Sequence, residues 1–449
     1  MTADAIQFYH DLLDDSMGQD SQDQLTRQLR KRNLFFGERP LCTVLRPRFL
    51  SFAQFRGMQT RVALLLRAFA KIHRAGLESA AFRAQFGLLD WEQELVLHDP
   101  GFHSPTPLSR LDAFYTPATG ELKFTEYNAE TPAAPAYNDQ LSNLFYGLPV
   151  MGEFMKQYQV RSLPARVGVL HALLDAYYQW LGRRARPNIA IIDWKEVPTY
   201  SEFGLFLNYF ESQGYNCVIV DPHDVEYRQG KLYAGEGPVD LIYKRVLISE
   251  LVAEGGLDHP IIRAVREGAV CMVNPFACKM LYKKASLAVL SDERNAGLFD
   301  ADELDAIAAH IPWTRVVAER HTTFAGQRVD LIPFIQQNRV RLVLKPNDDY
   351  GGRGIVLGWT VDDAAWEEAL RAALGSHYIV QERINIPWEP YPSLVDDKVV
   401  LADRMFDTAP FCFHGAFMAS CLTRLSTADL LNVTAGGGSS VPTFIADRR

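Results

Sequence analysis

The chain of 449 residues is acidic, with a net charge of −8, and 48% of its residues are hydrophobic. This length and composition suffice for a large core in two or three domains. The acidic balance, without any run of basic residues, excludes an extended nucleic-acid surface. The acidic N-terminus and the lack of a run of about eighteen apolar residues predict neither a secretory signal nor a membrane span. Six scattered cysteines without a C-x-x-C pair indicate reduced core thiols, so we expect a cytoplasmic protein with no membrane partner.

The first part of the chain, residues 1–100, is predicted to be a helical N-terminal region. Its clearest helix covers Phe52 to Ala75, where large apolar side chains recur at helical spacing. The segment Leu41 to Leu45 favours a short strand. Arg46 and Arg48, which follow it, are interpreted as solvated or salt-bridged surface residues, because arginine is rarely buried.

A β-hairpin is predicted from Leu108 to Asn128, where a turn containing Pro and Gly separates two stretches of alternating polarity. A three-residue loop with Gly120 in the left-handed conformation would place Asp112 opposite Glu126. Like charges at opposed positions are destabilising unless a cation neutralises them, and carboxylate and amide oxygens suit Mg²⁺. The spacing alone is equally typical of a solvated hairpin with ordinary surface charges, so both interpretations stand at this point.

Residues 101–185 combine this hairpin with helices, and residues 186–275 have the pattern of a separate α/β domain. Strand, helix and strand follow one another from Asn188 to Asp221, which predicts a βαβ unit in a parallel sheet. The first strand-to-helix turn lacks G-x-G-x-x-G and gives no support to a dinucleotide site. Lys244 and Arg245 end a later strand, at the edge where α/β sheets bind ligands, and either a substrate contact or a structural ion pair explains them.

A nucleotide-binding half is predicted in residues 276–449. A strand ending in Lys345 precedes a loop that includes Gly351 and Gly352, and glycines of this kind let backbone N–H groups approach phosphate. The loop is not a P-loop, because G-x-x-x-x-G-K-[ST] is absent, and a plain hairpin turn would also need these glycines. Asp348, beside the loop, is expected to point outward or to bind substrate.

Other polar side chains of this half lie in a helix or along strands. They are Lys279, Lys283 and Lys284 in a helix predicted from Phe276 to Leu290, Gln381 and Glu382 at the end of one strand, and Arg404 and Arg424 in two C-terminal strands. Charged side chains are usually solvated, so these patterns assign no role by themselves.

The hairpin residues resemble a known signature. R-x-D, followed by E-x-N and TP, is similar to the metal-binding motif of the circularly permuted ATP-grasp ligases related to glutathionylspermidine synthase. In this chain the motif residues are Arg110, Asp112, Glu126, Asn128, Thr131 and Pro132. The metal hairpin precedes the nucleotide lysines, which is the permuted order of that family. The resemblance extends from the hairpin to the C-terminus and covers the synthetase part only.

The resemblance implies a role for each matching residue. Asp112, Glu126 and Asn128 would hold Mg²⁺, and Arg110 would contact phosphate or the acyl substrate. The residues implied to bind ATP are Lys284, Lys345, Gly351, Gly352, Gln381 and Glu382. Arg424 matches the arginine that steadies the γ-phosphate, and Arg404 competes for the same role.

The same resemblance implies an α/β (α+β) ATP-grasp fold, circularly permuted, with a Rossmann-like pre-ATP-grasp domain. The implied activity is an ATP- and Mg²⁺-dependent ligase that joins a small-molecule carboxylate to an amine through an acyl-phosphate intermediate. A catalytically silent nucleotide-binding regulator and a phosphotransferase on the same fold are the alternatives. On the sequence alone, Asp112→Ala or Glu126→Ala is expected to abolish turnover and leave the fold intact, because repulsion between the carboxylates is relieved.

Overall fold

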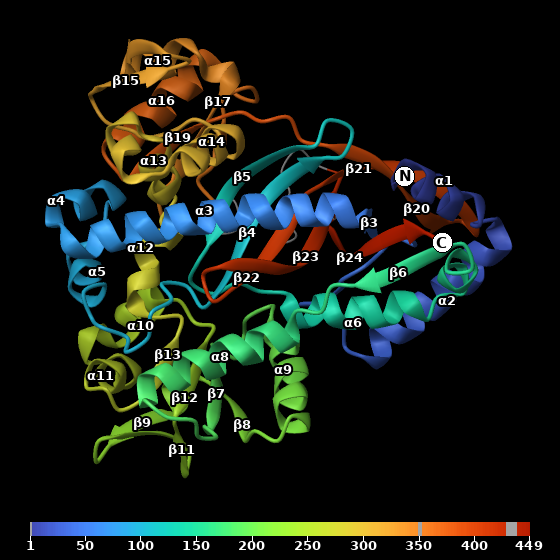
Figure 1. Cartoon of the computed structure of the whole chain (residues 1–449), viewed down its shortest axis with the longest axis horizontal. Helices are drawn as coiled ribbons and strands as arrows, with labels where there is room; N and C mark the ends of the chain where they lie inside the picture. The colour runs from blue at the N-terminus through green and yellow to red at the C-terminus, as the bar shows by residue number, and fades with distance from the viewer. Residues whose placement is uncertain (1, 349–352, 428–437) are drawn as a thin grey trace.

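The computed structural model describes residues 2–348, 353–427 and 438–449. The chain forms a mixed α/β molecule in which a large central sheet lies between two parts that each contain a smaller sheet (Figure 1). In the view of Figure 1 the parallel sheet and its helices lie below the central sheet, and the antiparallel sheet around β17 and β19 lies above it at the left. Helices α1 and α2 lie at the right, close to both marked ends of the chain.

The central sheet has the strand order β20-β21-β23-β22-β4-β5, and β24 branches from β23. Strand β24 also pairs with β3 in parallel and with β6 in antiparallel orientation, so strands from opposite ends of the chain join here. The bounds are β3 Arg48–Leu50, β4 Leu108–Thr116, β5 Glu121–Asn128, β6 Tyr158–Ser162, β20 Trp388–Val395, β21 Lys398–Phe406, β22 Ala409–Phe413, β23 Phe417–Ser426 and β24 Ser439–Arg448.

Helix α3, Phe52–Glu78, runs across one face of the central sheet, and it confirms the helix predicted from apolar spacing (Figure 1). A capping box starts it: Ser51 Oγ accepts from the amide of Gln54, and Gln54 Oε1 accepts from the amide of Ser51. The apolar face of α3 is buried in one core with hairpin residues such as Leu111. Since side chains alternate across a strand, Asp112 belongs to the opposite face of the sheet.

The N-terminal region is mainly helical, as expected, but two local predictions are wrong. Leu41 to Leu45 is not a strand. Arg46 and Arg48 are 0% and 1% exposed rather than surface residues, because both pair with Glu389 of β20, at 2.6 and 2.7 Å. The further elements of this region are α1 Thr2–Asp11, α2 Asp15–Lys31, β1 Phe35–Phe36, β2 Arg39–Pro40, α4 Ala80–Arg83 and α5 Asp90–Leu95.

The predicted parallel sheet is present, with the strand order β13-β12-β7-β8. Helix α9 joins β7 to β8 and completes the βαβ unit. At the end of β12, Lys244 and Arg245 are buried and pair with Glu130 and Glu202, each at 3.2 Å, which confirms the ion-pair interpretation. The elements of this part are α6 Pro135–Tyr146, α7 Pro149–Phe154, α8 Arg166–Leu181, β7 Ile189–Ile192, α9 Tyr200–Ser212, β8 Cys217–Val220, β9 Val225–Arg228, β10 Lys231–Ala234, β11 Gly237–Val239, β12 Leu241–Lys244, α10 Ile248–Gly255, α11 Pro260–Arg266 and β13 Cys271–Val273.

The third part of the molecule is built on an antiparallel sheet of order β14-β19-β17-β18. The single helix predicted from Phe276 to Leu290 is broken into α12 and α13, because Lys283 has an extended ψ of 132°. Lys284 therefore lies at a junction between two helices. The elements are α12 Lys279–Tyr282, α13 Ala285–Ser291, α14 Ala301–His310, β14 Thr314–Val316, β15 His321–Phe324, β16 Gln327–Asp330, α15 Leu331–Gln337, β17 Leu342–Pro346, β18 Val356–Leu357, α16 Asp363–Leu374 and β19 Tyr378–Glu382.

All six cysteines are buried and free, and burial raises the pKa of each thiol, as expected for core thiols. Within the described ranges, no helix combines the length and the apolar character needed to cross a membrane.

Candidate active site

The hairpin β4–β5 has the register that the sequence predicts, although its loop differs. Asp112 pairs with Glu126, and Arg110 pairs with Asn128. Gly120 is left-handed, with φ +70°, but the strands end at Thr116 and begin at Glu121, so the loop has four residues instead of three. A β-bulge between Asp112 and Ala113 shifts the register by one residue and restores the expected pairing.

Asp112 lies between two arginines. Its Oδ1 accepts from Arg110 Nε at 2.7 Å, and its Oδ2 accepts from Arg110 Nη2 at 3.1 Å and from Arg424 Nη2 at 2.7 Å. Only 6% of Asp112 is exposed. Burial alone would raise the pKa of this carboxyl, but the two guanidinium groups hold it well below its usual range. Arg110 and Arg424 thus neutralise the charge of Asp112, whereas the sequence predicted that a bound cation would do so.

Two lysines stand beside the other carboxylate of the hairpin. Lys284 Nζ lies 3.0 Å from Glu126 Oε1. Burial, helped by the charge of Lys284, lowers the pKa of Lys345 to about 8, although Glu126 and Asp112 oppose the shift. Because charges act on one another only over short distances in a protein, these four groups form one cluster. The structure brings together residues that are far apart in sequence.

The three lysines of the predicted helix have different surroundings. Lys279 and Lys283 point to Asp348, at 2.9 and 2.6 Å, and Lys283 also pairs with Glu92 at 2.8 Å. Asp348 therefore points into the protein, and the expectation that it points outward is wrong. Lys284 differs from both, because it reaches the hairpin. Its main-chain amide donates to the carbonyl oxygen of Asn347 at 3.0 Å, which fixes the junction next to the base of the glycine-rich loop.

The strand-end residues predicted to bind nucleotide have separate positions. Gln381 is 2% exposed; its Oε1 accepts from Lys345 Nζ at 2.7 Å, and its Nε2 donates to Thr314 Oγ1 at 3.0 Å. The Gln381 side chain thus orients Lys345. Glu382 is partly exposed, and its Oε1 lies 3.5 Å from Arg341 Nη2. Gly351 and Gly352 lie outside the described residues.

The two candidate arginines of the C-terminal strands also separate. Arg424 binds Asp112 directly, whereas Arg404 lies opposite Glu389 in the pairing of β20 with β21. Sequence reasoning missed Asp407, a buried acid that binds Arg424 at 2.6 Å. Asp407 lies between two strands in a stretch with no motif, so only the three-dimensional pairing reveals it.

The donor set of the hairpin fits a small, hard cation. The three hydrogen bonds to Asp112 leave one lone pair on its Oδ1. Two carboxylates and an amide are a typical partial shell for Mg²⁺, whose remaining ligands are water and substrate phosphates. Among the described residues, no group of three or more His, Cys, Asp or Glu is arranged to hold a metal ion. Asp112, Glu126 and Asn128 would therefore need water and a substrate phosphate to complete a metal's shell.

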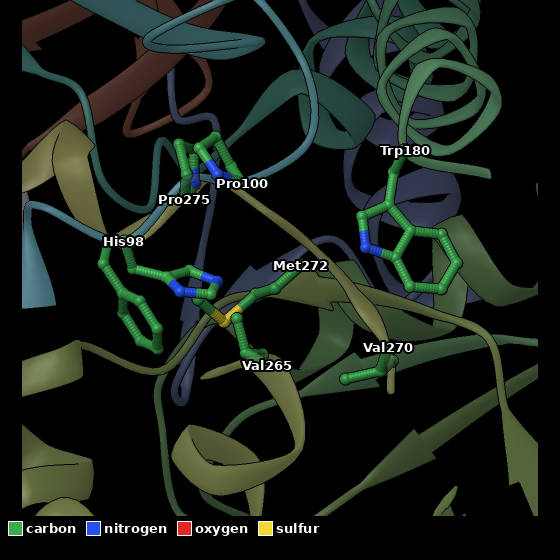
Figure 2. A pocket seen from close by; sticks show the side chains of 8 residues that line it. His98, Pro100, Trp180, Val265, Val270, Met272 and Pro275 are labelled. Atoms are coloured by element: carbon green, nitrogen blue, oxygen red, sulfur yellow. The ribbon is translucent and has the colours of Figure 1, made fainter. Parts of the chain in front are cut away.

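Two spaces in the described part of the chain lie elsewhere. A space of about 10 Å³, room for about one water, is lined by residues such as His98, Trp180 and Met272 (Figure 2). An open depression of about 370 Å³ lies where α15 meets α16, beside Gln336 and Glu367. Neither space is lined by a predicted site residue.

Comparisons with known proteins show the fold. No protein-family model and no curated protein sequence matches the chain. The structure of a glutathione synthetase-like effector from Globodera pallida in its apo form aligns with a TM-score of 0.61 and 13% identity, over 95% of this chain and 96% of that chain. At this identity the alignment shows a shared overall fold.

Two further solved structures align less well. A putative gamma-glutamylcysteine synthetase from Methylobacillus flagellatus KT gives a TM-score of 0.43 and 11% identity, over 85% of this chain and 88% of that chain. D-alanyl-alanine synthetase A from Vibrio cholerae gives a TM-score of 0.29 and 12% identity, over 57% of this chain and 74% of that chain.

Proposed function

We propose that the protein is an ATP- and Mg²⁺-dependent carboxylate–amine ligase. The observation that carries the proposal is the convergence of charged side chains from four distant segments on one face of the hairpin. They are Arg110, Asp112 and Glu126 of the hairpin, Lys284 of the helix junction, Lys345 of β17 and Arg424 of β23. A solvated hairpin would not gather cations from the rest of the chain. The fold shared with a glutathione synthetase-like effector supports the same class of chemistry.

The proposal includes a domain arrangement. We assign residues 101–185 to the metal-binding part of a circularly permuted ATP-grasp domain and residues 276–449 to its nucleotide-binding part. Residues 186–275, which contain the parallel sheet, would form the Rossmann-like pre-ATP-grasp domain, and residues 1–100 the helical N-terminal region. The position of the metal hairpin before the nucleotide lysines supports the permutation.

Lys284 and Lys345 would bind the phosphates of ATP, because both are next to Glu126 and carry the positive charge that phosphate requires. Gln381 holds Lys345 in place through its Oε1. Asp112, Glu126 and Asn128 would hold Mg²⁺, which would neutralise negative charge on the phosphates. Glu382, the residue after Gln381 on β19, would face the adenine or ribose side of the nucleotide.

In the proposed reaction a substrate carboxylate attacks the γ-phosphorus of ATP and ADP leaves. An amine then attacks the acyl-phosphate carbon, and phosphate leaves as the amide bond forms. Arg424 and Arg110 would stabilise the negative charge of the transferred phosphoryl group. No nucleophilic side chain is needed, since positioning and charge neutralisation carry both steps.

The test is phosphate release from Mg²⁺-ATP by the purified protein, with pools of carboxylates and amines that include glutathione, amino acids and polyamines. Hydroxylamine in place of the amine pool traps an acyl phosphate as a hydroxamate. Release that requires one acid, together with hydroxamate formation, is the expected result. Phosphate retained on the organic product would identify a phosphotransferase, and ATP binding without release under any condition would identify a silent regulator. Glu126→Gln, which preserves shape and removes charge, serves as the inactive control.

A further inference from the structure

We propose that Asp407 is a positioning residue that holds the guanidinium of Arg424 ready for a phosphoryl group; this inference rests on the proposed function. Asp407 lies between β21 and β22 and is 1% exposed. Its Oδ1 accepts from the Arg424 amide at 2.7 Å and its Oδ2 from Arg424 Nε at 2.6 Å. Arg424 Nη2 lies 2.5 Å from the same Oδ2. One carboxylate thus fixes both the backbone and the side chain of Arg424.

This pairing determines which edge of the guanidinium stays available. Nε and Nη2 form the edge that binds Asp407, and Nη2 also donates to Asp112 at 2.7 Å. Nη1 lies on the other edge of the planar group and has no hydrogen bond to any described residue. The Arg424 side chain is 20% exposed, so it has access to solvent. A phosphate oxygen would therefore meet Nη1 without displacing either carboxylate.

Asp407 also connects Arg424 to the hairpin. The next residue, Thr408, exchanges two backbone hydrogen bonds with Ala113: its amide donates to Ala113 O at 2.8 Å, and its carbonyl accepts from Ala113 N at 3.0 Å. Ala113 is the neighbour of Asp112 at the β-bulge. The segment 407–408 thus joins the residue that holds Arg424 to the hairpin strand that carries Asp112.

Charge balance supports a positioning role. Arg110, Asp112, Arg424 and Asp407 carry two positive and two negative charges, so the buried cluster is neutral. Without Asp407 the cluster would carry a net positive charge, and Arg424 would be held by Asp112 alone. Its guanidinium would then turn toward Asp112 and away from the position that the bidentate pair defines.

The experiment measures ATP affinity by calorimetry with Mg²⁺ present, and KM and kcat for phosphate release, in a double-mutant cycle of Asp407→Asn and Arg424→Gln. Asp407→Asn should weaken ATP binding by about 10–100-fold, as for residues that orient a binding group. In the Arg424→Gln background the same change should have no further effect, since no guanidinium remains to be held. A purely structural role would make the two effects multiply, and that result would overturn the inference.

Two further variants keep the test decisive. Asp292→Asn removes another buried carboxylate that binds two arginines, Arg294 and Arg320, and it should lower thermal stability without changing ATP affinity. Asp407→Glu keeps the charge, so it should bind ATP more tightly than Asp407→Asn and more weakly than the wild type. If Asp407→Asn does not fold, unchanged ATP affinity in Asp407→Glu overturns the inference. Wild-type protein that does not bind ATP overturns the proposed function itself, whereas unaltered affinity in the Asp407 variants overturns the inference alone.

Discussion

Removing the carboxylate of Asp112 should destabilise the protein as well as abolish turnover. The sequence alone favours an intact fold, but the structure reverses this expectation, because Asp112 is 6% exposed and binds two arginines. In Asp112→Ala, the one hydrogen-bond partner that Arg110 keeps among the described residues is the carbonyl oxygen of Ala133, at 3.0 Å. Removing one partner from a buried ion pair costs about 3–5 kcal/mol. Glu126 is 30% exposed and, within the described residues, its ion pair is with Lys284, so Glu126→Ala should cost only about 0.2–1 kcal/mol.

Urea unfolding of the two variants, followed by circular dichroism, tests this difference. Both variants should lose Mg²⁺-ATP turnover, but only Asp112→Ala should unfold at clearly lower urea. Asp112→Asn keeps the shape of the side chain and removes its charge, so it should behave like Asp112→Ala if the charge is what matters. Equal unfolding midpoints for Asp112→Ala and Glu126→Ala would refute the argument that the two arginines depend on Asp112.

Three further predictions follow from the lysines and from the N-terminal arginines. Because burial lowers the pKa of Lys345 to about 8, calorimetric ATP affinity should fall as the pH rises through this value, and Lys345→Met should bind ATP weakly at every pH. Lys284→Ala should lose activity with little change in thermal midpoint. Lys283→Ala, which removes a partner from the buried Glu92 and from Asp348, should instead lose stability, and paired activity and melting measurements separate the two. Burial alone would raise the pKa of Glu389, but its two arginine partners hold it at about 2, below the value in the unfolded chain. A depressed carboxyl pKa stabilises the folded state above the unfolded-state pKa, and this effect is lost as the pH falls. Glu389→Gln should therefore lower the free energy of unfolding by about 3 kcal/mol near neutral pH. Unfolding curves measured at falling pH should show a progressively smaller loss toward pH 2.

The hairpin shows how far sequence reasoning reached. Alternating polarity and the position of Gly120 led to the pairing of Asp112 with Glu126, because strand alternation and turn conformation both depend on local sequence. The loop length was wrong by one residue, and the bulge beside Ala113 corrected the register. A bulge leaves no clear sign in composition, so the correct pairing rested on two errors that cancel.

The remaining site residues depend on contacts between distant segments. The sequence places Gln381 at a strand end, but its partner Lys345 lies on the neighbouring strand, so the orientation of its amide is visible only in the folded protein. Asp348 was expected to point outward because it precedes a phosphate loop, yet two buried lysines draw it inward. Asp407 has no neighbouring motif at all. The helix break at Lys284 was missed for a similar reason, since helical propensity is high on both sides of it.

Strand β24 has a consequence for how the chain is made. Its first residues, 439–442, pair with β23, and its later residues lie between β3 on one edge and β6 on the other. Strand β3 comes from the first fifty residues of the chain. During synthesis β3 therefore stays unpaired until nearly all of the remaining chain has left the ribosome. The apolar surfaces of α1 and α3 that β24 covers stay open for that time, which makes the nascent chain a natural client for chaperones.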